Sequence, residues 1–147
     1  MSGLIIAAPS SSSGKTTVTL ALLRALSRRG EAISPIKIGP DYIDPGFHAA
    51  ACGTDCWNLD AWALGPAAYV DVIRRSEARG TLAVAEGVMG LFDGATLDEG
   101  ATADVAASTG WPVILVVDAS GMAASIAALV HGFVTYRPDV RIGGVIA

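Results

Sequence analysis

Residues 4–17 read LIIAAPSSSSGKTT, and the rest of the chain is interpreted from them. An apolar run over 4–8 leads into a loop of small residues, and Gly14, Lys15 and Thr16 follow at the start of a segment with helical spacing. Small residues let backbone N–H groups crowd around phosphate oxygens, and a helix N-terminus adds partial positive charge. This layout predicts a phosphate-binding loop and makes a nucleoside triphosphate the expected ligand.

Within this loop, Lys15 is expected to bridge the β- and γ-phosphates and the Thr16 hydroxyl to ligate Mg²⁺. The usual motif begins with glycine, whereas this chain has Pro9, and Ser10 stands where partitioning-type ATPases carry an extra lysine, which disfavours that subclass. A plain serine loop between a strand and a helix is the weaker alternative, because motif and context agree. The residues expected to bind ATP are Ser11, Ser12, Ser13, Gly14, Lys15, Thr16 and Thr17.

The composition suits one domain over residues 1–147 with a substantial core. Of the 147 residues 52% are hydrophobic and only 16% are charged, which predicts a body that buries surface against more protein. The net charge of −4 and the lack of a basic stripe argue against a nucleic-acid partner. Two cysteines do not suggest a disulfide framework.

No segment predicts membrane insertion or export. The apolar run at the N-terminus is too short for a signal peptide. The most membrane-like stretch, 112–134, contains Asp118 and His131 and changes midway from β-branched to alanine-rich, so it predicts a buried strand followed by a buried helix. We therefore expect a cytoplasmic protein with no membrane partner.

Apolar runs alternate with segments of helical spacing along the chain. Strands are expected over 3–8, 33–38, 81–86, 112–118 and 142–147, and helices over 15–29, 66–79, 102–109 and 122–136, with loops at 39–46 and 87–100. Continuous apolar strands between helices predict an α/β fold with a mostly parallel sheet covered on both faces. Pro35 places the second strand near an edge or a bulge. The last segment looks like a core strand, so we expect 1–147 to be part of a longer polypeptide.

In such sheets a ligand lies beyond the carboxyl ends of the strands, where several polar residues fall. Glu86 ends an apolar strand, where a phosphate-loop protein keeps its Mg²⁺-associated carboxylate, and the glycines after it, from Gly87, let the backbone approach a ligand. Asp93 follows in the same loop, although Asp93-Gly94 is equally typical of a turn. Asp118 at another strand end is a weaker candidate.

The segment KIGPDYIDP, residues 37–45, supplies a second cation and more carboxylates. Lys37 can reach toward the γ-phosphate, and Asp41 can hold Mg²⁺ or orient a substrate, whereas Asp44, before Pro45-Gly46, is better explained as a turn or cap residue. Mg²⁺ prefers hydroxyl and carboxylate oxygens, which makes Thr16, Asp41 and Glu86 the expected ligands. Asn58 and Asp60 are weaker candidates for the same site. The catalytic candidates are Lys15, Lys37, Asp41, Glu86 and Asp93.

His48, Cys52 and Cys56 are spaced by four and would share one face of a helix. This spacing suggests a zinc site. Gly53 interrupts the helix, however, and the other histidine, His131, is far along the chain, so free thiols are the preferred interpretation.

Taken together, the motifs resemble the cobyrinic acid a,c-diamide synthase family over essentially the whole chain. The matching segments are APSSSSGKTT, KIGPDYIDP, NLDAW, EGVMGLFDG and VVDASGM, of which EGVMGLFDG is the most specific. The resemblance implies a P-loop NTPase fold of the dethiobiotin synthetase type. It also implies an ATP- and glutamine-dependent amide ligase of cobalamin biosynthesis, which phosphorylates the a and c acetate carboxylates of a corrin and lets ammonia displace the phosphate.

The same resemblance implies a C-terminal amidotransferase domain that releases ammonia from glutamine and lies beyond these 147 residues. The corrin carboxylate is expected near Asp41, Tyr42 and Asp93. The residues expected to bind this polycarboxylate substrate are Asp41, Tyr42, Asp44, Gly87 and Asp93. A cobyric acid or dethiobiotin synthetase, a switch-type P-loop ATPase and a small-molecule kinase remain as alternatives. The sequence leaves open whether the corrin contains cobalt, and it is compatible with a homodimer.

Overall fold

A computed structural model describes residues 3–79, 82–96 and 99–147 of the chain. In this part of the chain, six strands form one sheet in the order β3-β2-β4-β1-β5-β6, and every neighbouring pair is parallel. The strands are β1 (Gly3–Ala7), β2 (Ile33–Ile38), β3 (Trp57–Leu59), β4 (Leu82–Glu86), β5 (Val113–Val116) and β6 (Ile142–Ile146). The predicted parallel α/β architecture is confirmed.

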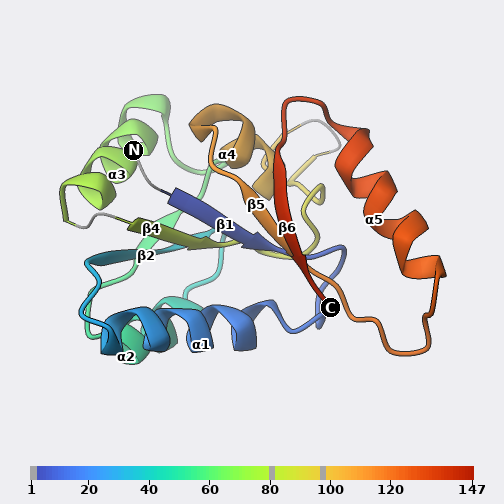
Figure 1. Ribbon diagram of the computed structural model, residues 1–147. Coiled ribbons are helices and arrows are strands. Elements are labelled where there is room, and N and C mark those ends of the chain that lie inside the picture. The colour runs from blue at the N-terminus through green and yellow to red at the C-terminus, as the bar shows by residue number, and fades with distance from the viewer. Residues whose placement is uncertain (1–2, 80–81, 97–98) are drawn as a thin grey trace.

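Helices cover both faces of this sheet (Figure 1). They are α1 (Lys15–Arg28), α2 (Asp44–Cys52), α3 (Pro66–Arg79), α4 (Thr102–Thr109) and α5 (Ser125–Tyr136). Helices α1 and α2 lie on one face, where Leu23 and Cys52 share a core cluster with Val84 of β4. Helices α3, α4 and α5 lie on the other face, where residues such as Val105 pack in the largest cluster. Strands buried between two helical layers explain the continuous apolar runs.

Two elements were not predicted from the sequence. Helix α2 begins at Asp44, within the segment expected to be a loop, because Pro45 fits the first helical turn, and it ends at Gly53 with a left-handed φ of 75°. Strand β3 forms the edge of the sheet and β2 lies next to it, which agrees with the expectation that Pro35 places the second strand near an edge or a bulge. Strand β3 pairs only with Ile36–Ile38, which leaves Pro35 outside that ladder.

The C-terminal third also departs from expectation. Helix α5 contains no buried residue, so the expected buried helix is wrong: it lies near the β6 edge of its face of the sheet and packs only one side against the core. Strand β6 is at the edge of the described sheet, with Val145 and Ile146 each more than 40% exposed. Helix α5 begins at Ser125, later than expected. The expected helix stop at Gly80 and the first residue of the 81–86 strand, Thr81, lie outside the described residues.

None of the helices in the described ranges is long and apolar enough to cross a membrane.

Gly87, directly after β4, is buried because Thr102 of α4 occupies the space of a side chain. A Cβ at Gly87 would lie 2.6 Å from Thr102 Oγ1 and 2.7 Å from its Cγ2. We expect Gly87→Ala to lower the free energy of unfolding by about 1–3 kcal/mol, the usual cost of overpacking. Denaturant unfolding of the complete protein measures this loss.

The double variant Gly87→Ala/Thr102→Ala tests whether the clash with Thr102 causes this loss. In the described structure the Thr102 hydroxyl is buried without a hydrogen-bond partner, so its removal leaves no other polar group without a partner. We expect the double variant to recover most of the stability, with Thr102→Ala alone as the control. Equal losses in the single Gly87→Ala variant and the double variant would contradict this packing explanation.

Candidate active site

The loop between β1 and α1 has the conformation of a phosphate-binding loop. Ser12 and Gly14 have left-handed φ values of 62° and 89°, which turn the chain so that α1 begins at Lys15. Lys15 Nζ donates to the carbonyl of Ser10 at 3.1 Å, so the side chain bends back over the loop. A pocket of about 290 Å³ is lined by Ser12, Gly14, Lys15, Thr16 and Thr17. Free N–H groups at a helix start, beside a lysine, form a natural site for phosphate.

The carboxyl ends of β2 and β4 bring Lys37 and Glu86 beside this loop. Lys37 and Glu86 are direct partners in the register of these neighbouring strands, so both side chains point to the α1–α2 face. The Thr16 hydroxyl, in the first turn of α1, donates to Glu86 Oε1 at 2.6 Å. Lys37 Nζ donates to the same oxygen at 3.1 Å. The hydroxyl of Thr16 and the ammonium of Lys37, from two different elements, therefore both contact one oxygen of the Glu86 carboxylate, which comes from a third.

Lys37 lies among three carboxylates although it is only 2% exposed. Its Nζ is 2.7 Å from Asp44 Oδ2, 3.1 Å from Glu86 Oε1 and 3.4 Å from Asp41 Oδ2. Burial alone lowers the pKa of Lys37, but the hydrogen bond to Asp44 and the charge of Glu86 outweigh it, so the pKa is raised. Lys37 therefore stays charged and neutralises part of the acidic cluster.

Glu86 is fully buried and still ionised. Burial alone raises the pKa of its carboxyl, but hydrogen bonds from His48 and Thr16 and the charge of Lys37 outweigh it, so the pKa is lowered. The pKa of Lys15 is lowered by burial and by the neighbouring charge of Lys37, although Glu86 acts in the opposite direction. The site therefore holds an anionic carboxylate next to a loop that suits phosphate.

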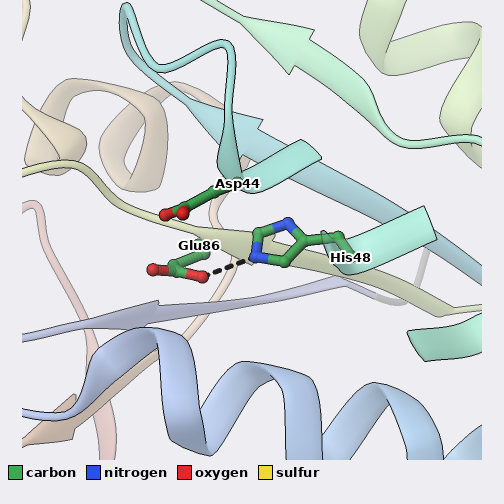
Figure 2. A group of neighbouring side chains, drawn as sticks. All are labelled: Asp44, His48 and Glu86. Atoms are coloured by element: carbon green, nitrogen blue, oxygen red, sulfur yellow. Dashed lines mark hydrogen bonds and ion pairs between the residues drawn. The ribbon is translucent and has the colours of Figure 1, made fainter. Parts of the chain in front are cut away.

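His48 is fully buried and extends from α2 toward Glu86, as Figure 2 shows. Its Nε2 lies 2.6 Å from Glu86 Oε2, the oxygen that faces away from Thr16 and Lys37. Asp44, one turn earlier on the same helix, directs its carboxylate to the same place (Figure 2). Ligand atoms of Asp44, His48 and Glu86 all lie within 4.8 Å of one another, which makes this group able to hold a metal ion.

Asp41 and Asp44 differ in their contacts. Asp41 Oδ1 accepts the backbone N–H groups of Ile43 and Asp44 at 3.0 and 3.1 Å, which shapes the turn into α2, while its Oδ2 faces Lys37. Asp44 Oδ2 lies 2.7 Å from Lys37 Nζ and 3.4 Å from Thr16 Oγ1. The expectation that Asp44 serves as a turn or cap residue is therefore wrong, because its side chain points into the site. Tyr42 is 76% exposed at its rim.

Asp93 lies nearer the phosphate loop than the acidic cluster. Its Oδ2 accepts the N–H of Gly90 at 2.9 Å and its own N–H donates to the Gly90 carbonyl, so it closes a tight turn. Its charge acts on Lys15. A pocket of about 490 Å³ opens beside it between this turn and α5, and is lined by Pro9, Phe92, Asp93, Ala128, Leu129, Gly132, Phe133 and Tyr136.

The weaker candidates have structural contacts. Asn58 Nδ2 donates to the carbonyls of Gly39 and Asp41 at 3.2 and 2.8 Å and so holds the loop that carries Asp41. Asp60 Oδ1 accepts the backbone N–H groups at positions 62 and 63. Asp118 accepts the backbone and hydroxyl donors of Ser120 in an exposed turn. Cys52 and Cys56 are free thiols, as expected.

Sequence reasoning missed His48 as a residue of this site. The spacing in the sequence indicates it only as a metal ligand together with the two cysteines, and the preferred interpretation, free thiols, gives it no role. The dipeptide Asp44-Pro45 is a usual helix start, and a helix from Asp44 would have placed His48 one turn later on the same face. Its partner Glu86 lies 38 positions away, so only the tertiary structure joins them.

The fold and the phosphate loop define the class of protein: this is a P-loop NTPase-type α/β domain. Residues 4–147 match the family model CbiA, described as the CobQ/CobB/MinD/ParA nucleotide binding domain, and the chain belongs to this family.

Curated relatives are similar over nearly all of the chain. It is 57% identical to the hydrogenobyrinate a,c-diamide synthase of Brucella anthropi in an alignment that covers 99% of this chain and 34% of that protein. It is 58% identical to the protein of the same name from Streptomyces coelicolor, over 97% of this chain and 30% of that protein. The Rhizobium meliloti protein of this name is 55% identical over 99% of this chain and 34% of its own length. The chain thus spans about a third of the length of these relatives.

Proposed function

We propose that the chain is the ATP-binding domain of an amide-forming ligase that converts the a and c acetate carboxylates of hydrogenobyrinic acid, or of its cobalt-containing counterpart, into carboxamides. The names of the relatives support the substrate class. The observation that carries the chemistry is the 2.6 Å contact between the Thr16 hydroxyl of the phosphate loop and Glu86 Oε1 at a strand end. Such a pair is suited to a cation that accompanies a nucleoside triphosphate.

The donor set fits Mg²⁺. Thr16 Oγ1 lies 2.6 Å from Glu86 Oε1 and 3.4 Å from Asp44 Oδ2. Adjacent ligands of an octahedral ion with bonds near 2.1 Å are about 3 Å apart, so the spacing of Thr16 Oγ1 to each of these two carboxylate oxygens is suitable. The sequence favoured Asp41 as the third ligand, and the contacts favour Asp44 with Asp41 beside it. When bound, Mg²⁺ would neutralise charge on the β- and γ-phosphates.

The chain's own residues have distinct parts in this proposal. The backbone N–H groups around Gly14 and the ammonium of Lys15 bind the phosphates of ATP. Lys37 balances the charge of the carboxylates on one side and faces the γ-phosphate on the other. A corrin carboxylate oxygen attacks the γ-phosphorus, the bond to ADP breaks, and an acyl phosphate forms. Because a carboxylate is a poor acyl donor, this phosphorylation supplies the leaving group.

The second half of the proposed reaction needs ammonia. Ammonia attacks the acyl carbon, inorganic phosphate leaves, and the nitrogen loses a proton to give the carboxamide. Glutamine is the proposed source, through an amidotransferase domain in the remainder of the protein. Coverage of only about a third of the relatives leaves room for such a domain. Tyr42, Asp93 and Gly87 stay proposed substrate contacts, with Tyr42 exposed at the rim of the site.

The complete protein, incubated with ATP, Mg²⁺, glutamine and either hydrogenobyrinic or cobyrinic acid, tests the proposal. Each amidation replaces a hydroxyl by an amino group, so mass spectrometry of the corrin counts the converted carboxyls. We expect conversion of both acetate groups, and the preferred acid identifies the substrate. ATP hydrolysis with both corrins unchanged would contradict the ligase proposal and favour a switch-type ATPase.

A further inference from the structure

The side of Glu86 that faces away from the phosphate loop is closed by a buried histidine and a cysteine. His48 Nε2 lies 2.6 Å from Glu86 Oε2, and His48 Nδ1 lies 3.6 Å from Cys56 Sγ. His48 and Glu86 are fully buried and Cys56 is half-buried. The three side chains come from α2, from β4 and from the residue before β3, so they form a row that only the folded sheet assembles.

The chemistry of this row sets the position of the hydrogens. An ionised carboxylate only accepts hydrogen bonds, so Nε2 must carry the hydrogen in its short contact with Glu86. A neutral imidazole with a hydrogen on Nε2 has an acceptor at Nδ1. A cysteine thiol carries an S–H donor, and Cys56 Sγ lies within reach of Nδ1, so the thiol can donate its hydrogen to Nδ1. The Trp57 carbonyl, at 3.5 Å, is another acceptor within reach of this thiol.

We propose that His48 and Cys56 are positioning residues for Glu86: the thiol donates to Nδ1, the imidazole keeps its hydrogen on Nε2, and the Nε2–H anchors Oε2. The other oxygen, Oε1, is then directed at Thr16 and Lys37. This role rests on the proposed function, because it matters only if Glu86 holds the cation that accompanies ATP.

The anchoring has a physical purpose. The terminal torsion of a glutamate is broad, so an unanchored carboxylate would rotate between its contacts. A donor on Oε2 fixes the plane of the carboxylate and leaves Oε1 for the contacts at 2.6 Å to Thr16 and 3.1 Å to Lys37. Removal of such an outer partner of a metal ligand lowers metal affinity or activity by about 10- to 100-fold.

Binding of Mn²⁺ to the complete protein in the presence of ADP, followed by electron paramagnetic resonance, tests the role of His48. We expect His48→Leu to weaken Mn²⁺ binding by about 10- to 100-fold while leaving metal-free ADP affinity unchanged. We expect His48→Gln, whose amide can donate near the position of Nε2, to recover most of the affinity. The shorter His48→Asn should not recover it. Tight Mn²⁺ binding by folded His48→Leu, or equal weakening by all three variants, would overturn the proposal.

The hydrogen positions have their own test. Long-range ¹H–¹⁵N spectra of the complete protein labelled with ¹⁵N-histidine report which ring nitrogen carries the hydrogen, and His48→Gln identifies the His48 signals by their loss. We expect a hydrogen on Nε2, with an Nδ1 signal that moves in Cys56→Ala and is largely retained in Cys56→Ser. A hydrogen on Nδ1 in the wild type, or an Nδ1 signal unaffected by Cys56→Ala, would overturn the proposal.

These readouts separate the inference from the proposed function. If the wild type binds Mn²⁺ with ADP but amidates no corrin, the proposed reaction fails and the positioning role is still decided by the variants. If the wild type binds no Mn²⁺ with ADP, Glu86 holds no cation and the positioning role fails with it.

Discussion

Glu86→Gln should lower the turnover of ATP-dependent amidation by about 100- to 1,000-fold, the usual effect of removing one preorganised electrostatic group. The substitution keeps the shape of the side chain but removes the charge that faces Thr16 and Lys37. The amide of the new side chain also carries an NH₂ group, which can only donate hydrogen bonds. This group would face one of the three groups that donate hydrogen bonds to the Glu86 carboxylate. The variant should therefore need more Mg²⁺ as well as turning over more slowly. The measurement is the initial rate of product formation over a range of Mg²⁺ concentrations.

Glu31→Gln is the matched control for this experiment. Glu31 is exposed just before β2, at the opposite end of that strand from Lys37, and its carboxylate is 4.0 Å from the guanidinium of Arg29. It should keep the wild-type rate and Mg²⁺ requirement. Wild-type turnover in Glu86→Gln would remove Glu86 from the proposed reaction.

Lys37→Met should cost about 3–5 kcal/mol of unfolding free energy at neutral pH, because removal of one partner leaves buried charge uncompensated. Lys37 is the cation that lies between Asp41, Asp44 and Glu86, at 2.7 to 3.4 Å from each. Methionine has a similar length and keeps the apolar contacts of the stem, so the loss isolates the charge. Denaturant unfolding of the complete protein measures it, and added Mg²⁺ should restore part of the stability.

The pH dependence of this loss follows from the two shifted pKa values. The pKa of Lys37 is raised on folding. Its contribution to stability is therefore complete at pH values below the unfolded pKa near 10.4, and is lost as the pH rises through the folded pKa. The pKa of Glu86 is lowered on folding. Its contribution to stability is therefore complete at pH values above the unfolded pKa of about 4.3, and is lost as the pH falls through the folded pKa. The difference in unfolding free energy between the wild type and Lys37→Met should be largest between these two pH limits and should shrink in acid.

Arg75→Met provides the comparison, since Arg75 forms an exposed ion pair with Asp71 one turn away on α3. Exposed pairs of this kind contribute little. We expect little change in its stability at any pH. If Lys37→Met were as stable as Arg75→Met, the acidic cluster would not depend on Lys37 for its charge balance.

Much of the fold was predictable because its signals are local. A few neighbouring residues are enough to indicate the small-residue loop at 10–14 and the strands β1, β4 and β5, which are apolar runs. Lys37 and Glu86 could be singled out because each lies at or beside the end of such a run, and parallel strands bring their carboxyl ends to one edge. Their exact register as direct partners required the assembled sheet.

The sequence by itself thus determined the phosphate loop, the parallel α/β class and the strand ends at which acidic and basic residues gather. Only the tertiary structure decided that His48 belongs to the site and that Asp44 lies against Lys37, because α2 contains Gly46 and a short, mixed pattern that is weak as an isolated helix. Packing of α2 against α1 and β2 stabilises this helix, and only then do Asp44 and His48 reach Lys37 and Glu86. Local propensity does not determine contacts between residues 38 positions apart. Such contacts form when burial of the apolar faces packs the helices onto the sheet.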